Sequence, residues 1–93
     1  MVTLEIAREW LRLDGTDNDF IIEGLLAAVP GYIEVTTGLK PLDQEKEPLA
    51  DTVTRFLLIL WYDAEQADAD QLQKTIDNLL KALSLKKKHL PNR

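Results

Sequence analysis

The sequence has no cysteine and only one histidine among its 93 residues. Without cysteine the chain can form no disulfide, no thiol nucleophile and no thiolate metal site. The histidine, His89, lies in a basic stretch near Pro91 with no acidic residue close in sequence, so it lacks the partner that a catalytic histidine needs. A glycine-rich phosphate loop and a metal-ligand spacing are also missing. We therefore expect no enzyme, no cofactor and no metal site.

An acidic turn between Asp14 and Asp19 is the one stretch that invites comparison with a calcium loop. An EF-hand starting at Asp14 would have Asp19 in place of the sharp-turn glycine and Leu25 in place of the bidentate glutamate. Helix capping accounts for the turn better. Gly15 can take positive φ to end one helix, and Thr16 or Asp17 can cap the next.

The chain is the size of one small domain, so we expect a single helical domain over residues 1–93. The first residues lack the basic and apolar regions of a signal peptide, which favours a cytoplasmic protein. The longest uncharged run of large apolar residues, Phe56 to Tyr62, is too short to cross a bilayer, which takes about 20 residues. We expect no membrane association.

The net charge of −5 conceals an asymmetry between the end of the chain and the rest. Residues 86–93 contain four basic residues and no acid, and we interpret them as a basic tail that need not be ordered. The other 85 residues contain 7 bases and 16 acids, a balance of −9. A body this acidic should repel nucleic-acid phosphates.

The run from Phe56 to Tyr62 should be the centre of the fold, because a helix that is apolar on every side must be covered on most sides. A buried strand is the alternative, since periodicity alone does not separate the two for a short run. The flanking residues favour a helix from about Pro48 to Gln66. Apolar residues recur across it at steps of three and four, namely Leu49, Val53, Phe56, Leu57, Leu60, Trp61 and Ala64.

Two amphipathic helices should precede this central helix. The first begins after Thr3, a plausible N-cap, and ends near Arg12, with Arg8 and Arg12 on its outer side. The second spans about 18–36 and stops at Gly38. Its inward stripe comprises Ile22, Leu25, Leu26, Val29, Tyr32, Ile33 and Thr36. Pro30 removes a backbone donor, which predicts a kink or a division into two shorter helices.

A loop and a last helix complete the expected fold. Residues 39–47 lack an apolar period and read as a solvated connection, or else as a mobile or partner-contacting segment. The last helix should be capped by Asp68 or Asp70. Its inward stripe comprises Leu72, Ile76, Leu79, Leu80 and Leu83. The predicted architecture is thus all-α, a bundle of four to five helices around a central apolar helix.

Large amphipathic and basic side chains are the candidates for binding a partner or a second copy. Tryptophan and tyrosine are enriched in cores and interfaces alike, and we favour the core for Trp61. The candidate binding residues are Trp10, Arg12, Tyr62, Lys86, Lys87, Lys88 and Arg93.

Two stretches together resemble a known protein family. The first runs from Leu4-Glu5 through Trp10-Leu11-Arg12-Leu13-Asp14 and the acidic turn to Tyr32-Ile33-Glu34 and Thr37-Gly38. The second is Leu57-Leu58-Ile59-Leu60-Trp61-Tyr62-Asp63. Their order is similar to that in the small head–tail connector proteins, also called head-completion or adaptor proteins, of tailed bacteriophages and prophages.

This resemblance implies a structural virion protein at the head–tail junction. Copies would form a homo-oligomeric ring under the portal protein, extend the DNA channel and dock the tail-side completion protein. DNA would pass through the lumen without specific binding. Whether the free subunit is a monomer or already assembled stays open. The alternative is a small helical interaction or regulatory protein, including one that binds nucleic acid through its basic C-terminus.

Overall fold

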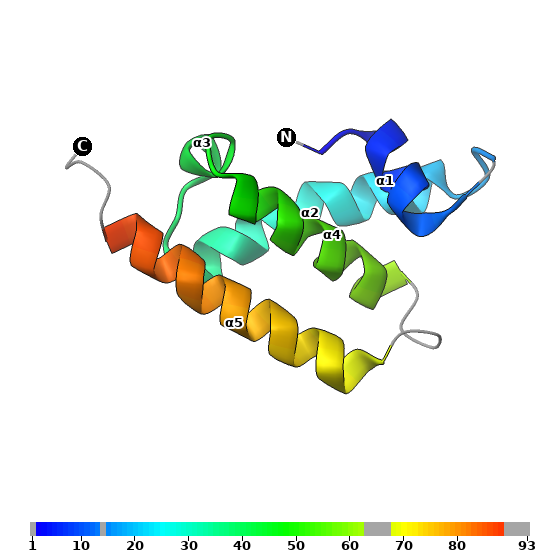
Figure 1. Ribbon diagram of the computed structural model, residues 1–93. Helices are drawn as coiled ribbons and strands as arrows, with labels where there is room; N and C mark the ends of the chain where they lie inside the picture. Colours follow the sequence, from blue (N-terminus) through cyan, green and yellow to red (C-terminus); the bar gives the residue numbers. More distant parts are fainter. Residues whose placement is uncertain (1, 14, 63–67, 89–93) are drawn as a thin grey trace.

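Five α-helices and no strand are found in the part of the chain that the computed structural model describes, residues 2–13, 15–62 and 68–88. The helices are α1 (Leu4–Leu11), α2 (Asp19–Thr37), α3 (Pro41–Gln44), α4 (Pro48–Tyr62) and α5 (Ala69–Lys88). In Figure 1, α4 crosses in front of α2, α5 runs below both, α1 lies at one end and α3 lies toward the other. The predicted all-α bundle is confirmed.

The apolar helix α4 is at the centre of the bundle, as the sequence predicts. It contacts all four other helices. No residue from Phe56 to Tyr62 is exposed, and the side chains of Leu57 and Leu58 are 1% and 0% accessible. The helix begins at Pro48, and the strand alternative is excluded. The predicted extension to Gln66 falls in 63–67, outside the described residues.

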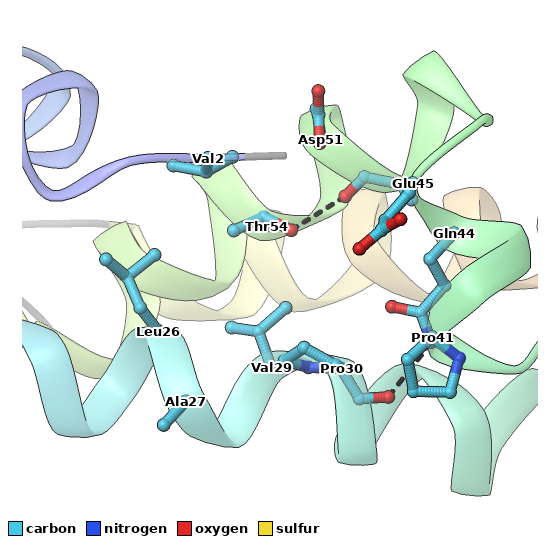
Figure 2. A pocket seen from close by; sticks show the side chains of 11 residues that line it. Val2, Leu26, Ala27, Val29, Pro30, Pro41, Gln44, Glu45, Asp51 and Thr54 are labelled. Carbon is cyan, nitrogen blue, oxygen red and sulfur yellow. Dashed lines mark hydrogen bonds between the residues drawn. The ribbon is translucent and has the colours of Figure 1, made fainter.

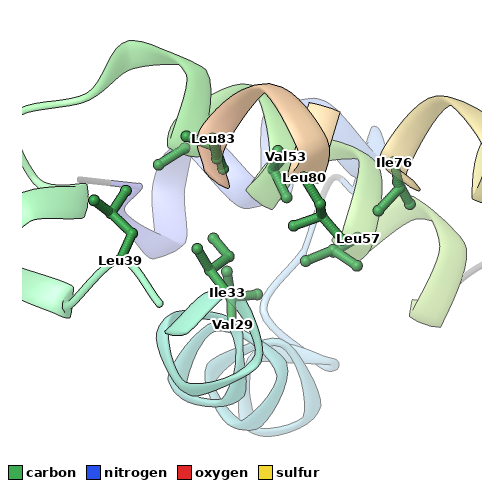
Figure 3. Close-up of a cluster of buried hydrophobic side chains, with 9 residues drawn as sticks. Val29, Ile33, Leu39, Val53, Leu57, Ile76, Leu80 and Leu83 are labelled. Atoms are coloured by element: carbon green, nitrogen blue, oxygen red, sulfur yellow. The ribbon is translucent and has the colours of Figure 1, made fainter. Parts of the chain in front are cut away.

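Two apolar clusters meet along α4. The larger one joins α2, α4 and α5 (Figure 3), and its buried members are Val29, Ile33, Leu39, Ala50, Val53, Leu57, Ile76, Leu80 and Leu83. The smaller one lies under α1 and consists of Ala7, Ile22 and Leu58. Leu57 and Leu58 are neighbours in sequence but belong to different clusters. A helix that is apolar on all sides therefore holds both halves of the domain together.

Helix α2 is one continuous helix, so the predicted division at Pro30 is wrong. Val29 and Ile33, on either side of this proline, are both buried in the larger cluster. Packing on α4 and α5 thus keeps the helix continuous through Pro30, although proline removes one hydrogen bond of the ladder. The predicted stop is confirmed, because Gly38 ends the helix at φ 80°. Thr37 is buried and Thr36 is exposed, the reverse of the predicted stripe at this end.

Helix α1 begins at the predicted N-cap, but the residue that ends it in the left-handed conformation is not the predicted glycine. The Thr3 hydroxyl accepts a hydrogen bond from the Ile6 N–H at 3.2 Å. The left-handed residue at its end is Arg12, at φ 57°, and Gly15 does not have positive φ. The Arg12 and Leu13 N–H groups donate to the carbonyls of Glu9 and Arg8 at 3.1 and 3.0 Å, the pattern of a Schellman motif.

Residues 39–47 are largely exposed, as predicted for a connection, but they are partly helical and are anchored by the buried Leu39 and Gln44, which the prediction did not include. Leu39 lies in the larger cluster, and the next residues form α3. The buried Gln44 side chain donates to the carbonyls of Pro30 at 3.0 Å and of Leu39 at 2.8 Å. These two bonds fasten α3 to α2. Side-chain hydrogen bonds of this kind leave no periodic signal in a sequence.

Helix α5 follows its prediction closely. The Asp68 carboxylate accepts from the Gln71 N–H at 3.2 Å, which confirms it as a cap. Ile76, Leu80 and Leu83 are buried, and the other two members of the predicted stripe pack against the same cluster. The helix continues through Lys88. The start of the predicted tail is therefore the last turn of α5, and residues 89–93 lie outside the described part.

Candidate interaction surface

One side of α2 is apolar and faces solvent. With 3.6 residues per turn, seven residues without a charge fall within an arc of about 120°. All seven are exposed, and they are Phe20, Ile21, Gly24, Ala27, Ala28, Gly31 and Val35. We refer to them as the α2 outer face. The larger cluster lies entirely on the other side of this helix (Figure 3).

The largest side chains of the α2 outer face are almost bare. Phe20 is 89% accessible, Val35 87% and Ile21 54%. Between the first two lie only glycine and alanine, and a methyl group added at Gly24 or Gly31 would meet no atom of the chain within 4 Å. A shallow apolar face with a bulky residue near each end suits close packing by another helix. Contiguous apolar exposure of this kind marks interaction sites.

Glu23 and Glu34 border the α2 outer face, and α2 carries no basic residue to balance its three acids. The exposed side of α5 is mixed in charge, because Lys74 and Lys81 alternate along it with Asp70 and Asp77. Leu85, one turn beyond Lys81, is 58% exposed. Both helices direct their apolar sides into the same cluster, so these outer surfaces lie on different sides of the bundle (Figure 3).

Three of the predicted binding residues lie at the α1 end of the domain. Trp10 and Tyr62 are half-buried and pack against the smaller cluster. The Arg55 guanidinium lies over the Trp10 ring, 5.7 Å from its centre, in a cation–π contact. Arg12, two residues after Trp10, is exposed. Trp61 is half-buried against the larger cluster, with its ring edge-on to that of Tyr32 at 5.5 Å between centres.

The predicted basic residues lie at the other end and are not brought together with Trp10 and Tyr62 (Figure 1). The Lys86 ammonium pairs with the Glu47 carboxylate at 3.1 Å. The Lys87 stem passes close to Gly38, where a Cβ would lie 3.5 Å from the lysine Cε. Lys88 is the last residue of α5, and Arg93 lies outside the described residues. Two of these lysines therefore contact the body of the domain.

An ion pair between Arg8 and Asp19, which the sequence pattern does not indicate, joins two of the helices. Two guanidinium nitrogens of Arg8 donate to the two carboxylate oxygens of Asp19 at 2.8 and 2.7 Å. Arg8 was predicted on the outer side of α1, yet its side chain is only 24% accessible. The hydrogen bonds from Arg8 lower the pKa of the Asp19 carboxyl, and the same contact raises the pKa of Arg8. The pair joins α1 to the start of α2.

A pocket of about 330 Å³ opens between α2, α3, α4 and the segment before α1 (Figure 2). It is lined by Val2, Leu26, Ala27, Val29, Pro30, Pro41, Gln44, Glu45, Ala50, Asp51 and Thr54. The Gln44 amide is already bonded to backbone carbonyls, and the Thr54 hydroxyl donates to the Ala50 carbonyl at 2.8 Å. Its walls are mainly apolar, and these two polar side chains are used within the fold.

Two further observations concern the described residues. They contain no group of three or more histidine, cysteine, aspartate or glutamate side chains placed to hold a metal ion. By length and composition α2 would be able to cross a membrane, a criterion that core helices of folded domains also meet.

Comparison of the chain with protein-family models, with curated proteins and with solved structures finds no match.

Proposed function

We propose that this protein is a structural assembly subunit, and specifically a head–tail connector subunit of a tailed bacteriophage or prophage. The observation that carries the proposal is the α2 outer face, on which Phe20 and Val35 are almost fully exposed. Single exposed apolar residues are ordinary on protein surfaces. A continuous face of seven along one helix indicates contact with another protein.

A ring is built from a heterologous contact, in which two different surfaces of one subunit meet head to tail and close. The bundle offers two such surfaces. The α2 outer face is apolar with a border of glutamates, and the exposed side of α5 carries Lys74 and Lys81 between aspartates, with the exposed Leu85 one turn further on. Pairing of the α2 glutamates with these two lysines favours an ordered head-to-tail approach over random association. The ring contact in this proposal joins the α2 outer face to α5 of the next subunit.

The charge of the chain suits a channel for DNA. The net charge is −5, and the domain up to residue 85 carries −9. A lumen lined by an acidic body repels phosphates, which lets DNA pass without being held. In this reading Arg12 and the half-buried Trp10 and Tyr62 at the α1 end contact the portal or the tail-side protein.

The experiment combines the purified chain with the portal protein of the same phage or prophage. Co-sedimentation should show the chain bound to portal rings, and electron microscopy should show added density under the portal. Binding of the free chain to duplex DNA at moderate salt should be absent. The opposite result is a chain that does not bind the portal but binds DNA, with an affinity that falls steeply as the salt concentration rises. That result would identify a nucleic-acid binder acting through its basic C-terminus.

A further inference from the structure

The sequence of the α2 outer face reads almost the same in both directions. About a midpoint between Ala27 and Ala28, Gly24 corresponds to Gly31, and Phe20 corresponds to Val35. If two copies of α2 lie antiparallel across this midpoint, each small residue meets a small residue. Phe20 meets Val35 of the other copy, and Ile21 is the exception, because it falls opposite Glu34. The face is thus complementary to itself under a two-fold rotation, the symmetry of the commonest protein dimers.

We infer that the free protein is a two-fold dimer held by antiparallel packing of the α2 outer faces. The small residues at the centre let the two helix backbones approach closely, because Gly24 and Gly31 have no neighbouring atom within 4 Å on that side. Phe20 and Val35 cover the two ends of the contact. Antiparallel helices also place the positive end of each helix dipole beside the negative end of the other.

Charge complementarity supports this arrangement over a parallel one. The antiparallel pairing brings Lys40, just after the end of α2, level with the turn that contains Asp17 of the other copy. The two-fold axis repeats this approach at the opposite end. Both side chains are exposed, and within the described residues neither has an ion pair. Glu23 and Glu34 fall opposite Tyr32 and Ile21 of the other copy, so no two acids of the pair of helices oppose each other.

The dimer should be reversible and separate from the proposed ring. Interfaces of standard size take about 20–30 residues a side, and one helix face with its borders supplies fewer. A two-fold contact also closes on itself and cannot build a ring. The two-fold contact covers the α2 outer face while the chain is free. The dimer must therefore dissociate before this face can take part in the ring. The inference does not depend on the proposed function, since a dimer can be found or excluded without the portal.

The experiment measures mass against concentration by sedimentation equilibrium. The wild-type chain should pass from 10.6 kDa toward twice that mass as concentration rises. Ala28→Glu should remain at 10.6 kDa at every concentration while keeping its helical circular dichroism, because Ala28 is exposed in the single chain. Thr52→Glu, which adds the same charge at an exposed position on α4, should behave like the wild type. A wild type that stays monomeric throughout would overturn the inference.

The pairing itself is tested by single cysteines, since the chain has none of its own. Ala28→Cys lies next to the two-fold axis and should be crosslinked by copper phenanthroline. Val35→Cys should not, because the two copies of residue 35 lie about 22 Å apart along the helices in this arrangement. Equal crosslinking of both variants would indicate a parallel pair and overturn the inference. A second result would also overturn the inference. In it the wild-type chain binds phosphatidylglycerol vesicles, Ala28→Glu does not, and no dimer is found in solution.

Charge exchange gives an independent test of the same arrangement. Lys40→Glu and Asp17→Lys should each weaken dimerisation by severalfold, because each places like charges together at both ends of the contact. The double variant should recover most of the wild-type dimerisation. Additive losses in the double variant would contradict the pairing of these two residues.

Discussion

Arg12 is held in a conformation that a glycine would adopt more easily. Its φ of 57° lies in the left-handed region, and no other described residue except Gly38 has positive φ. The motif that ends α1 needs this conformation at this position, so the side chain is retained against a local cost. An exposed arginine at a position that suits glycine agrees with the proposed role of Arg12 in contacting a partner.

Arg12→Gly should raise the free energy of unfolding by about 0.5–1 kcal/mol. Relief of the left-handed strain exceeds the extra freedom that glycine gives the unfolded chain. The same change should weaken binding to the portal. Urea denaturation and co-sedimentation measure the two effects. Unchanged portal binding in a stabilised variant would remove Arg12 from the proposed contact.

Asp19 makes the stability of the domain depend on pH. Its pKa is lowered by the hydrogen bonds from Arg8, so the pair contributes fully above the unfolded pKa of about 4 and is lost as pH falls through the lower folded value. Asp19→Asn should therefore lower the melting temperature at pH 7 and have little effect near pH 2. Asp17→Asn is the matched control in the same turn. A melting difference that is the same at both pH values would contradict this role of the pair.

At the scale of elements, the arrangement depends on which side of each helix finds a partner. α4 is covered by all four other helices, α5 on one side, and α2 on one side only. The sequence pattern predicts α4 and α5 well because their apolar residues are both periodic and buried. It predicts α2 less well, since this helix is apolar on its inner and outer sides and periodicity does not tell which side remains bare.

Leu57→Ala should cost about 2–5 kcal/mol of unfolding free energy, enough to unfold much of so small a domain. The side chain is 1% accessible and lies in the larger cluster. Leu60→Ala should cost less, because Leu60 is only half-buried. Urea denaturation followed by circular dichroism measures both. A cost under about 1 kcal/mol at Leu57 would mean that α4 is not the centre of the fold.

Gln44→Ala should lower stability by about 1–3 kcal/mol, because it leaves the carbonyls of Pro30 and Leu39 without their donor. The change should also speed hydrogen exchange in α3 relative to α5. Gln71→Ala, at an exposed position of α5, is the control and should shift stability by less than about 0.5 kcal/mol. Equal effects of the two changes would show that α3 is not held by this side chain.

For the whole molecule, the sequence was sufficient for the architecture and insufficient for the surface. Four of the five helices, the central one among them, the Thr3 and Asp68 caps and the stop at Gly38 follow from periodicity and local hydrogen bonding, whereas α3 does not. The Arg8–Asp19 pair and the fastening of α3 by Gln44 join residues 11 and 14 positions apart, and only the folded chain shows them. The bare side of α2 likewise appears only when the helices that cover the other side are in place.

The central claim is that the protein works by assembly through the α2 outer face. Electron microscopy of portal rings mixed with the wild-type chain, with Ala28→Glu or with the exposed control Thr52→Glu tests it most directly. The account predicts an added ring under the portal with the wild type and with Thr52→Glu, and bare portals with the folded Ala28→Glu chain. Rings of equal occupancy with all three chains, or none with the wild type, would contradict it.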